Sequence, residues 1–157
     1  KIYEKQGMTD AQAQSLMDVI EYAADGQKTE GSAREGGITV RRFVSGVNCY
    51  PGTAREEMMA TKRRFGKEDG TVAYHGYQSF APGEATPEIA HEIGVKLAQR
   101  LWGKRYQVLV ATHLDHENHL HNHFVVNTVS FVDGIKYHRT GKDYRAMREA
   151  SGNTVCP

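Results

Sequence analysis

The sequence has few of the features that mark disulfide-bonded or membrane-spanning proteins. Its 157 residues include two cysteines, Cys49 and Cys156, without Cys-x-x-Cys spacing, and no apolar run approaches the roughly 18 residues that a membrane span needs. The sequence therefore argues against a disulfide scaffold and against a membrane partner. Cysteine usage of this kind fits a reducing compartment, so we expect a cytoplasmic protein.

Charge of one sign is equally scarce, since 20 lysines and arginines against 19 acidic residues leave a formal net charge of +1. That balance does not by itself indicate a nucleic-acid-binding protein, so a polyanion site must be a local concentration of cations. Such concentrations occur at residues 41–42, 62–64, 104–105 and 136–148, although a single basic cluster is usually a solvated surface.

One domain is expected at this length, and we assign residues 1–150 to it. The last residues, "SGNTVCP" at 151–157, follow no pattern and are expected to be a C-terminal tail. Because the sequence opens on Lys1 and trails off in this way, we expect it to be a piece of a longer polypeptide.

Apolar spacing and capping residues predict three helices. The first runs from about Asp10 to Ala24, and a polar, glycine-rich loop, "DGQKTEGSAREGG", follows it. The second starts at Thr53, with Glu56 in a capping-box position, and stops at Gly66. The third, "TPEIAHEIGVKLAQRLWG", is capped by Thr86.

Strands are predicted for "ITVRRFV", "TVAYHGYQSF", "YQVLVATHL" and "LHNHFVVNTVSFV" from their β-branched and aromatic content. Asp133-Gly134 predicts a hairpin between the last of these and "IKYH". Helices interspersed with hairpin-connected strands indicate an α+β fold, a mainly antiparallel central sheet with helices packed on it.

Histidine is what the sequence has in abundance, and five of its eight histidines lie in "THLDHENHLHNHFVVN", residues 112–127. Side chains alternate across a strand, so His121 and His123 share a face, as does His119 if the strand begins early enough. His113 closes the preceding strand, and the short link lets the two strands pair as neighbours. Three neutral imidazoles around one point, with an open position, are the pattern of a catalytic metal site.

Two plainer explanations compete with a metal. A purification tag is excluded because the cluster is internal and interleaved with apolar strand residues. Surface decoration is harder to exclude, but it would leave unpaired imidazoles beside the core on the face that carries Val125. We therefore predict a bound divalent metal, with Asp115 and Asn127 as candidate partners for the ligating rings. For Asp115, a turn residue is an equally good explanation.

The histidine motif and several other blocks of the sequence resemble those of a known family. His113-x-Asp115 and then His121-x-His123 before "FVVN" are similar to the three-histidine motif of the relaxase/mobilisation nucleases. These HUH-type proteins, such as the VirD2/MobA-like relaxases, nick the DNA of plasmids and conjugative transposons. Similar blocks, "VIEYAADGQKTEG", "YHGYQSF" and "APGEATPEIAHEIGVKLA", extend the resemblance from about Ser15 to Lys136.

The resemblance implies the HUH endonuclease sandwich and a site-specific, strand-specific activity at an origin of transfer. A tyrosine attacks one phosphodiester, stays on the 5′-phosphate and frees a 3′-hydroxyl. Among eight tyrosines, Tyr22 matches the family's position at the end of a first helix, and Tyr3 is a distant second. At about 100° per residue, Tyr22 also lies about 180° from Ala13, opposite the apolar stripe. A merely exposed tyrosine is the plainer alternative.

The implied metal ligands are His113, His121 and His123, with His119 as a possible substitute for His113. Because the pKa of a phenol is about 10, the tyrosine needs a base or a cation that favours phenolate. The metal polarises the phosphate, and Asp115 either accepts the proton or orients a ligand. Magnesium or manganese is expected in function, whereas imidazoles by affinity prefer late transition metals such as zinc or nickel.

The implied partners are single-stranded and hairpin DNA at the transfer origin and accessory relaxosome proteins. Ser79 in "YHGYQSF" matches the family's serine block and is a candidate phosphate contact, with an ordinary strand serine as the alternative, and His75 shares its strand face. Single-stranded DNA needs cations along its backbone and flat groups for its bases. Candidate cations are Arg41, Arg42, Lys136, Arg139 and Lys142.

Other functions stay open at this point. A rolling-circle replication initiator or a transposase of the HUH type often carries its tyrosine after the histidines, whereas Tyr22 precedes them. A non-cleaving module that binds a DNA hairpin and a small-molecule metalloenzyme are the alternatives from other classes.

Overall fold

The computed structural model of the chain describes residues 2–4, 33–35, 38–40, 43–113, 120–138 and 145–150. The predicted first helix, Asp10 to Ala24, and most of the glycine-rich loop lie outside these ranges.

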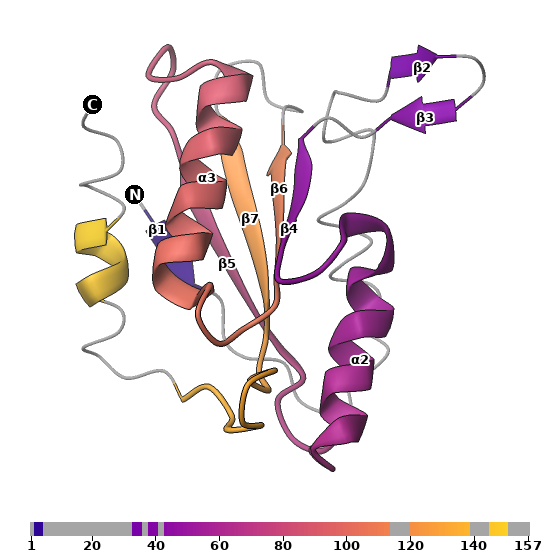
Figure 1. Ribbon diagram of the computed structural model, residues 1–157. Helices are drawn as coiled ribbons and strands as arrows, with labels where there is room; N and C mark the ends of the chain where they lie inside the picture. Colours follow the sequence, from indigo (N-terminus) through magenta and orange to yellow (C-terminus); the bar gives the residue numbers. More distant parts are fainter. Residues whose placement is uncertain are drawn as a thin grey trace.

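Five strands form the main sheet, in the order β1-β5-β7-β6-β4, and every neighbouring pair in it is antiparallel (Figure 1). This confirms the predicted α+β class and the pairing of the two histidine-bearing strands as neighbours. The β1 strand was not predicted. The strands are β1 (Ile2–Glu4), β4 (Val44–Val47), β5 (Ala73–Ser79), β6 (Val108–His113) and β7 (His121–Asn127).

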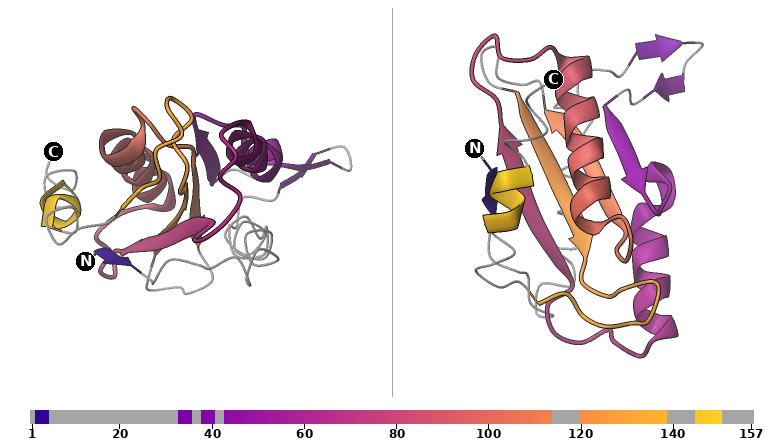
Figure 2. Two further views of the ribbon diagram at one scale, coloured as in Figure 1. Left: turned by 90° about the horizontal axis from the view of Figure 1, so that it is seen from below. Right: turned by 60° about the vertical axis from the view of Figure 1, so that its left-hand side comes forward.

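Two helices cover opposite faces of this sheet (Figure 2). Because side chains alternate along β6, Val108 and Val110 pack with α3 (Pro87–Trp102), whereas Leu109 and Ala111 pack with α2 (Ala54–Arg64). Every residue of β6 is buried, which explains why its sequence is apolar at successive positions instead of alternating.

The boundaries of α2 and α3 agree with the predicted second and third helices to within about two residues. Thr86 Oγ1 accepts a hydrogen bond from the Ile89 backbone N–H, as the prediction requires. At α2 the predicted capping box of Thr53 and Glu56 does not form. A 3₁₀ turn, η2 (Pro51–Thr53), precedes the helix, and Glu57 instead accepts hydrogen bonds from the Tyr50 backbone N–H and the Thr53 hydroxyl.

The predicted strand "ITVRRFV" is divided between two sheets. Its first part is β3 (Ile38–Val40), which pairs with β2 (Ala33–Glu35) in a two-stranded ribbon. Its last residue begins β4 of the main sheet. The ribbon stands away from the body of the sheet in Figure 1.

The predicted hairpin at Asp133-Gly134 is much shorter than expected. The chain does reverse there, with Gly134 at φ 72°, a conformation that favours glycine. However, β7 already pairs with β5 on one edge and β6 on the other, so "IKYH" has no free edge along it. The turn is therefore closed beyond the strand, by an isolated bridge between Val129 and Lys136.

Candidate functional site

The three predicted histidine ligands meet on the α2 face of the sheet, at the end of β6 and the start of β7. His113 pairs directly with His121, and His123 lies diagonally across from His113, opposite Ala111. The ring centroids of His113 and His123 are 3.9 Å apart, and those of His121 and His123 are 6.4 Å apart. His113 is buried, whereas His121 and His123 are half-buried. We call these three side chains the imidazole cluster.

The neighbouring strand β5 contacts two rings of the imidazole cluster through their Nδ1 atoms. Ser79 Oγ lies 2.9 Å from His121 Nδ1, directly across the strand pair. His75 Nε2 lies 2.8 Å from His123 Nδ1, with the two rings within 19° of parallel and their centroids 5.1 Å apart. A hydrogen bond at one ring nitrogen fixes the orientation and tautomer of an imidazole.

The cluster fits a divalent cation in the type and number of its donors, three imidazoles from adjacent strand positions. The ring orientations fit less well, since His113 and His123 lie ring against ring. Within the ranges that the structure describes, no group of three or more histidine, cysteine, aspartate or glutamate side chains is arranged to hold a metal ion.

The side chain of Asn127 takes part in a different cluster from the one predicted. It lies at the other end of β7, where its amide nitrogen donates to the Met58 carbonyl and to Gln107 Oε1. Its oxygen accepts a hydrogen bond from the buried ammonium of Lys62. These hydrogen bonds connect the end of α2 to the sheet. Asn127 lies away from the imidazole cluster and does not contact it.

Lys136, a predicted DNA contact, also lies beyond the far end of β7, where its ammonium donates to the Asp69 carbonyl. Several other predicted site residues are outside the described residues. These are Tyr22, Asp115, His119, Arg41, Arg42, Arg139 and Lys142.

Thiol chemistry has little support at Cys49, the cysteine within the described residues. Burial, and then the negative charge of Glu57, raise the pKa of its thiol to about 11. The thiolate, which is the nucleophilic form, is therefore scarce at neutral pH.

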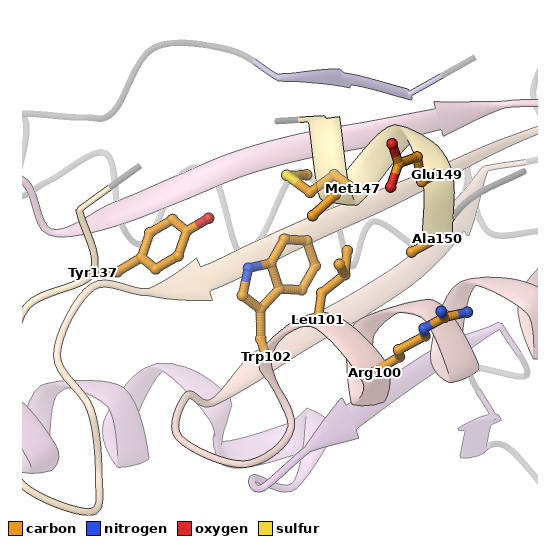
Figure 3. Close-up of a pocket in the computed structure, with 8 residues that line it drawn as sticks. Arg100, Leu101, Trp102, Tyr137, Met147, Glu149 and Ala150 are labelled. Carbon is orange, nitrogen blue, oxygen red and sulfur yellow. The ribbon is translucent and has the colours of Figure 1, made fainter. Parts of the chain in front are cut away.

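A cavity of about 390 Å³ lies between the end of α3 and the helical residues 145–150 (Figure 3). Trp102, Tyr137 and Met147 line it together with Arg100 and Glu149. Because α3 ends at Trp102, whereas His91 near its start contacts the residue beside His113, the cavity is remote from the imidazole cluster.

Comparison with known proteins identifies the family. A family model described as "Relaxase: MobA/VirD2-like, nuclease domain" matches residues 27–155, which include the whole imidazole cluster. The chain belongs to the MobA/VirD2-like relaxase family. Tyr22 precedes the matched part of this relaxase domain.

Relatives with two different names are similar to the chain. "Protein rlx" of Staphylococcus aureus is 38% identical over 112 residues, which are 71% of this chain and 35% of the relative. "Group II intron-interrupted relaxase LtrB" of Lactococcus lactis is 36% identical over 72 residues, 45% of this chain and 13% of the relative. The relaxase domain therefore spans about a third of the length of the first of these relatives.

Sequence reasoning missed the two β5 contacts to the imidazole cluster. Strand parity places His75 and Ser79 on one face of β5, but only the strand order shows that this face adjoins His121 and His123. Nothing in the local sequence "TVAYHGYQSF" indicates which strand it pairs with.

Proposed function

We propose that this domain nicks one DNA strand at an origin of transfer, for conjugative transfer or mobilisation, through a covalent tyrosyl intermediate. The observation that carries the proposal is the imidazole cluster on two paired strand ends of a chain that belongs to the relaxase nuclease family. DNA is its substrate and principal partner, and accessory relaxosome proteins are expected to present the origin.

The reaction exchanges one phosphoester for another. The phenolic oxygen of Tyr22 attacks the scissile phosphorus, the bond from phosphorus to the 3′-oxygen breaks, and the 5′-phosphate stays on the tyrosine. The phenol gives up its proton, for which Asp115 is our candidate acceptor, and the departing 3′-oxygen takes one up. Because the new linkage is again a phosphodiester, the free 3′-hydroxyl can reverse the reaction and reseal the strand.

We further propose that His113, His121 and His123 hold a divalent cation, magnesium or manganese in function, with His119 as a possible replacement for His113. When bound, the cation supplies positive charge to the scissile phosphate. The protein's own contribution is to hold the rings, and the hydrogen bonds at Nδ1 of His121 and His123 direct their Nε2 atoms away from β5.

Ser79 and His75 fit this proposal as positioning residues. Each was predicted as a DNA contact, but each already has a hydrogen bond to an imidazole. A ligating histidine typically has such a partner at its second nitrogen, which raises its basicity and fixes its plane.

Covalent capture tests the function. The protein is mixed with a 3′-labelled, randomised single-stranded DNA library and Mn²⁺ or Mg²⁺, and the products are separated on a denaturing gel. We expect a labelled band that migrates with the protein, and sequencing the captured DNA then gives a defined substrate. The band should be absent in Tyr22→Phe, because the ring without its hydroxyl has no nucleophile.

Tyr50→Phe is the matched control, since Tyr50 is an exposed tyrosine outside the imidazole cluster, and it should give a full-strength band. A full-strength band in Tyr22→Phe would contradict the assignment of the nucleophile. Tight DNA binding without a band under any metal would instead favour the hairpin-binding module.

A further inference from the structure

Behind the imidazole cluster, on the face that α3 covers, polar side chains form one continuous hydrogen-bonded chain. Thr112 and Asn122 in this chain are fully buried, Gln78 is nearly so, and Ser45 and His91 are half-buried. We call it the His91 network. In bonded order its members are Ser45 of β4, His91 of α3, Thr112 of β6, Asn122 of β7 and Gln78 of β5.

The His91 network and the imidazole cluster alternate along the same strands. Thr112 immediately precedes His113, and Asn122 lies between His121 and His123. Gln78 immediately precedes Ser79, the partner of His121. Successive side chains point to opposite faces of a sheet. In each of these three strands, a residue of the His91 network therefore lies on the α3 face, next in sequence to an imidazole or its partner on the α2 face.

The hydrogen bonds run in one direction. Asn122 Nδ2 donates to the Ala90 carbonyl at 2.7 Å and to Gln78 Oε1 at 3.2 Å, so its oxygen faces Thr112. Thr112 Oγ1 donates its single hydrogen to that oxygen at 2.6 Å. The Thr112 oxygen can then only accept from His91 Nδ1, 2.9 Å away.

The direction of these hydrogen bonds places a hydrogen on Nδ1 of His91. With the hydrogen on Nδ1, the neutral ring leaves Nε2 to accept from the Ser45 hydroxyl at 2.7 Å. Burial lowers the pKa of His91, which favours this neutral form. A buried polar chain in which every group is paired specifies a unique arrangement of the elements that it joins.

The helix backbone packs closely against the network at Gly94. A Cβ added at Gly94 would lie 2.5 Å from Asn122 Nδ2 and 2.7 Å from its Cγ. Asn122 thus reaches the helix backbone at Ala90, one turn earlier, because position 94 has no side chain. Close contact and hydrogen bonds together tie α3 to the middle of the sheet.

We propose that the His91 network is a positioning device for the imidazole cluster, holding β5, β6 and β7 in the register and twist that bring the three rings together. The catalytic part of this inference rests on the proposed nicking function, whereas the structural part does not. A displacement of about 1 Å at a reacting centre can cost about 10²-fold in rate, so a group that touches no substrate can still control it.

Removing one hydroxyl tests the proposal. In Thr112→Val the side chain keeps its shape, but both His91 Nδ1 and Asn122 Oδ1 lose a partner. We expect the single-turnover nicking rate at saturating captured DNA to fall at least tenfold, with the Kd for DNA within about threefold of wild type. The histidine side-chain NMR signals of His113, His121 and His123 should also shift in the metal-free protein. Thr112→Ser, which restores the hydroxyl, should return both measurements close to wild type.

Thr61→Val is the matched control, because Thr61 donates a comparable buried hydrogen bond to Gln107 Oε1 at the opposite end of β6. It should lower Tm by a similar amount and leave the nicking rate and the imidazole signals unchanged. Unshifted imidazole signals in Thr112→Val, or equal defects in Thr112→Val and Thr112→Ser, would overturn the proposal. If wild-type protein does not nick DNA, the proposed function fails, and the NMR comparison alone still decides the positioning role.

Discussion

At the scale of single residues, the orientation of each imidazole ring depends on which of its nitrogens forms a hydrogen bond with the neighbouring strand. His121 and His123 are bonded at Nδ1 by side chains of β5, and these contacts leave Nε2 as the atom directed away from that strand. The sequence predicted which histidines share a face, because parity follows from strand period alone. It did not predict their partners, since the His75 contact crosses diagonally between two strands that are far apart in the sequence.

A metal-binding measurement tests these contacts residue by residue. His121→Ala should lose most of its manganese, measured by elemental analysis after gel filtration, because one of three ligands is gone. Ser79→Ala should keep the ligand but weaken manganese affinity by about 10- to 100-fold, as the loss of a hydrogen-bonded partner typically does.

His138→Ala is the control, since His138 is exposed and outside the imidazole cluster, and its manganese affinity should match wild type. Unchanged occupancy in His121→Ala would refute the metal site. If Ser79→Ala instead has the manganese affinity of wild type but binds DNA more weakly, Ser79 contacts a DNA phosphate, as the sequence analysis predicted.

At the scale of helices and strands, local chemistry predicted the elements and long-range packing decided their neighbours. The start of α3 follows from the Thr86 cap, and both α2 and α3 end within two residues of a glycine, so these bounds depend on residues next to the helices themselves. The strand order does not follow from the local sequence. It shows that the predicted long hairpin at Asp133-Gly134 was wrong, because both edges of β7 are already paired with other strands. A turn signal is local, whereas a free strand edge is a property of the whole sheet.

The attachment of α3 to the sheet should depend on pH through His91. Burial lowers the pKa of His91 in the folded protein, whereas the unfolded value is about 6.5. Below that pH the unfolded state binds a proton that the folded state resists, so the free energy of unfolding falls as pH decreases. We expect wild-type protein to lose more stability than His91→Asn between pH 7.5 and 5.5 in urea titrations.

The variant keeps a donor at the Nδ1 position but has no group that titrates in this range, so the comparison isolates His91 from the other histidines. A difference between the two proteins that stays constant with pH would show that His91 is protonated equally in both states. A difference that changes in the opposite direction would mean that the folded state favours the charged ring.

At the scale of the whole molecule, the five-stranded sheet carries the imidazole cluster at one end, and the Lys62–Asn127 contact and the bridge from Val129 to Lys136 at the other. Lys62, Asn127 and Lys136 are therefore away from the imidazole cluster. With a net charge of +1, the domain depends on local cations for any DNA contact. No helix among the described residues is long and apolar enough to cross a membrane. The pairing of His113 with His121 was predictable because the two strands follow each other closely in sequence, whereas the His91 network joins residues that range from position 45 to position 122.

Mass spectrometry of the covalent protein–DNA adduct tests whether a DNA phosphate is transferred to a tyrosine at the imidazole cluster. Captured adduct is digested with nuclease and protease, and the peptide that retains a 5′-linked nucleotide is sequenced by fragmentation. We expect one modified peptide, with the phosphate on Tyr22, and its loss in His123→Ala. A nucleotide on another residue, or undiminished modification of Tyr22 in His123→Ala, would contradict it.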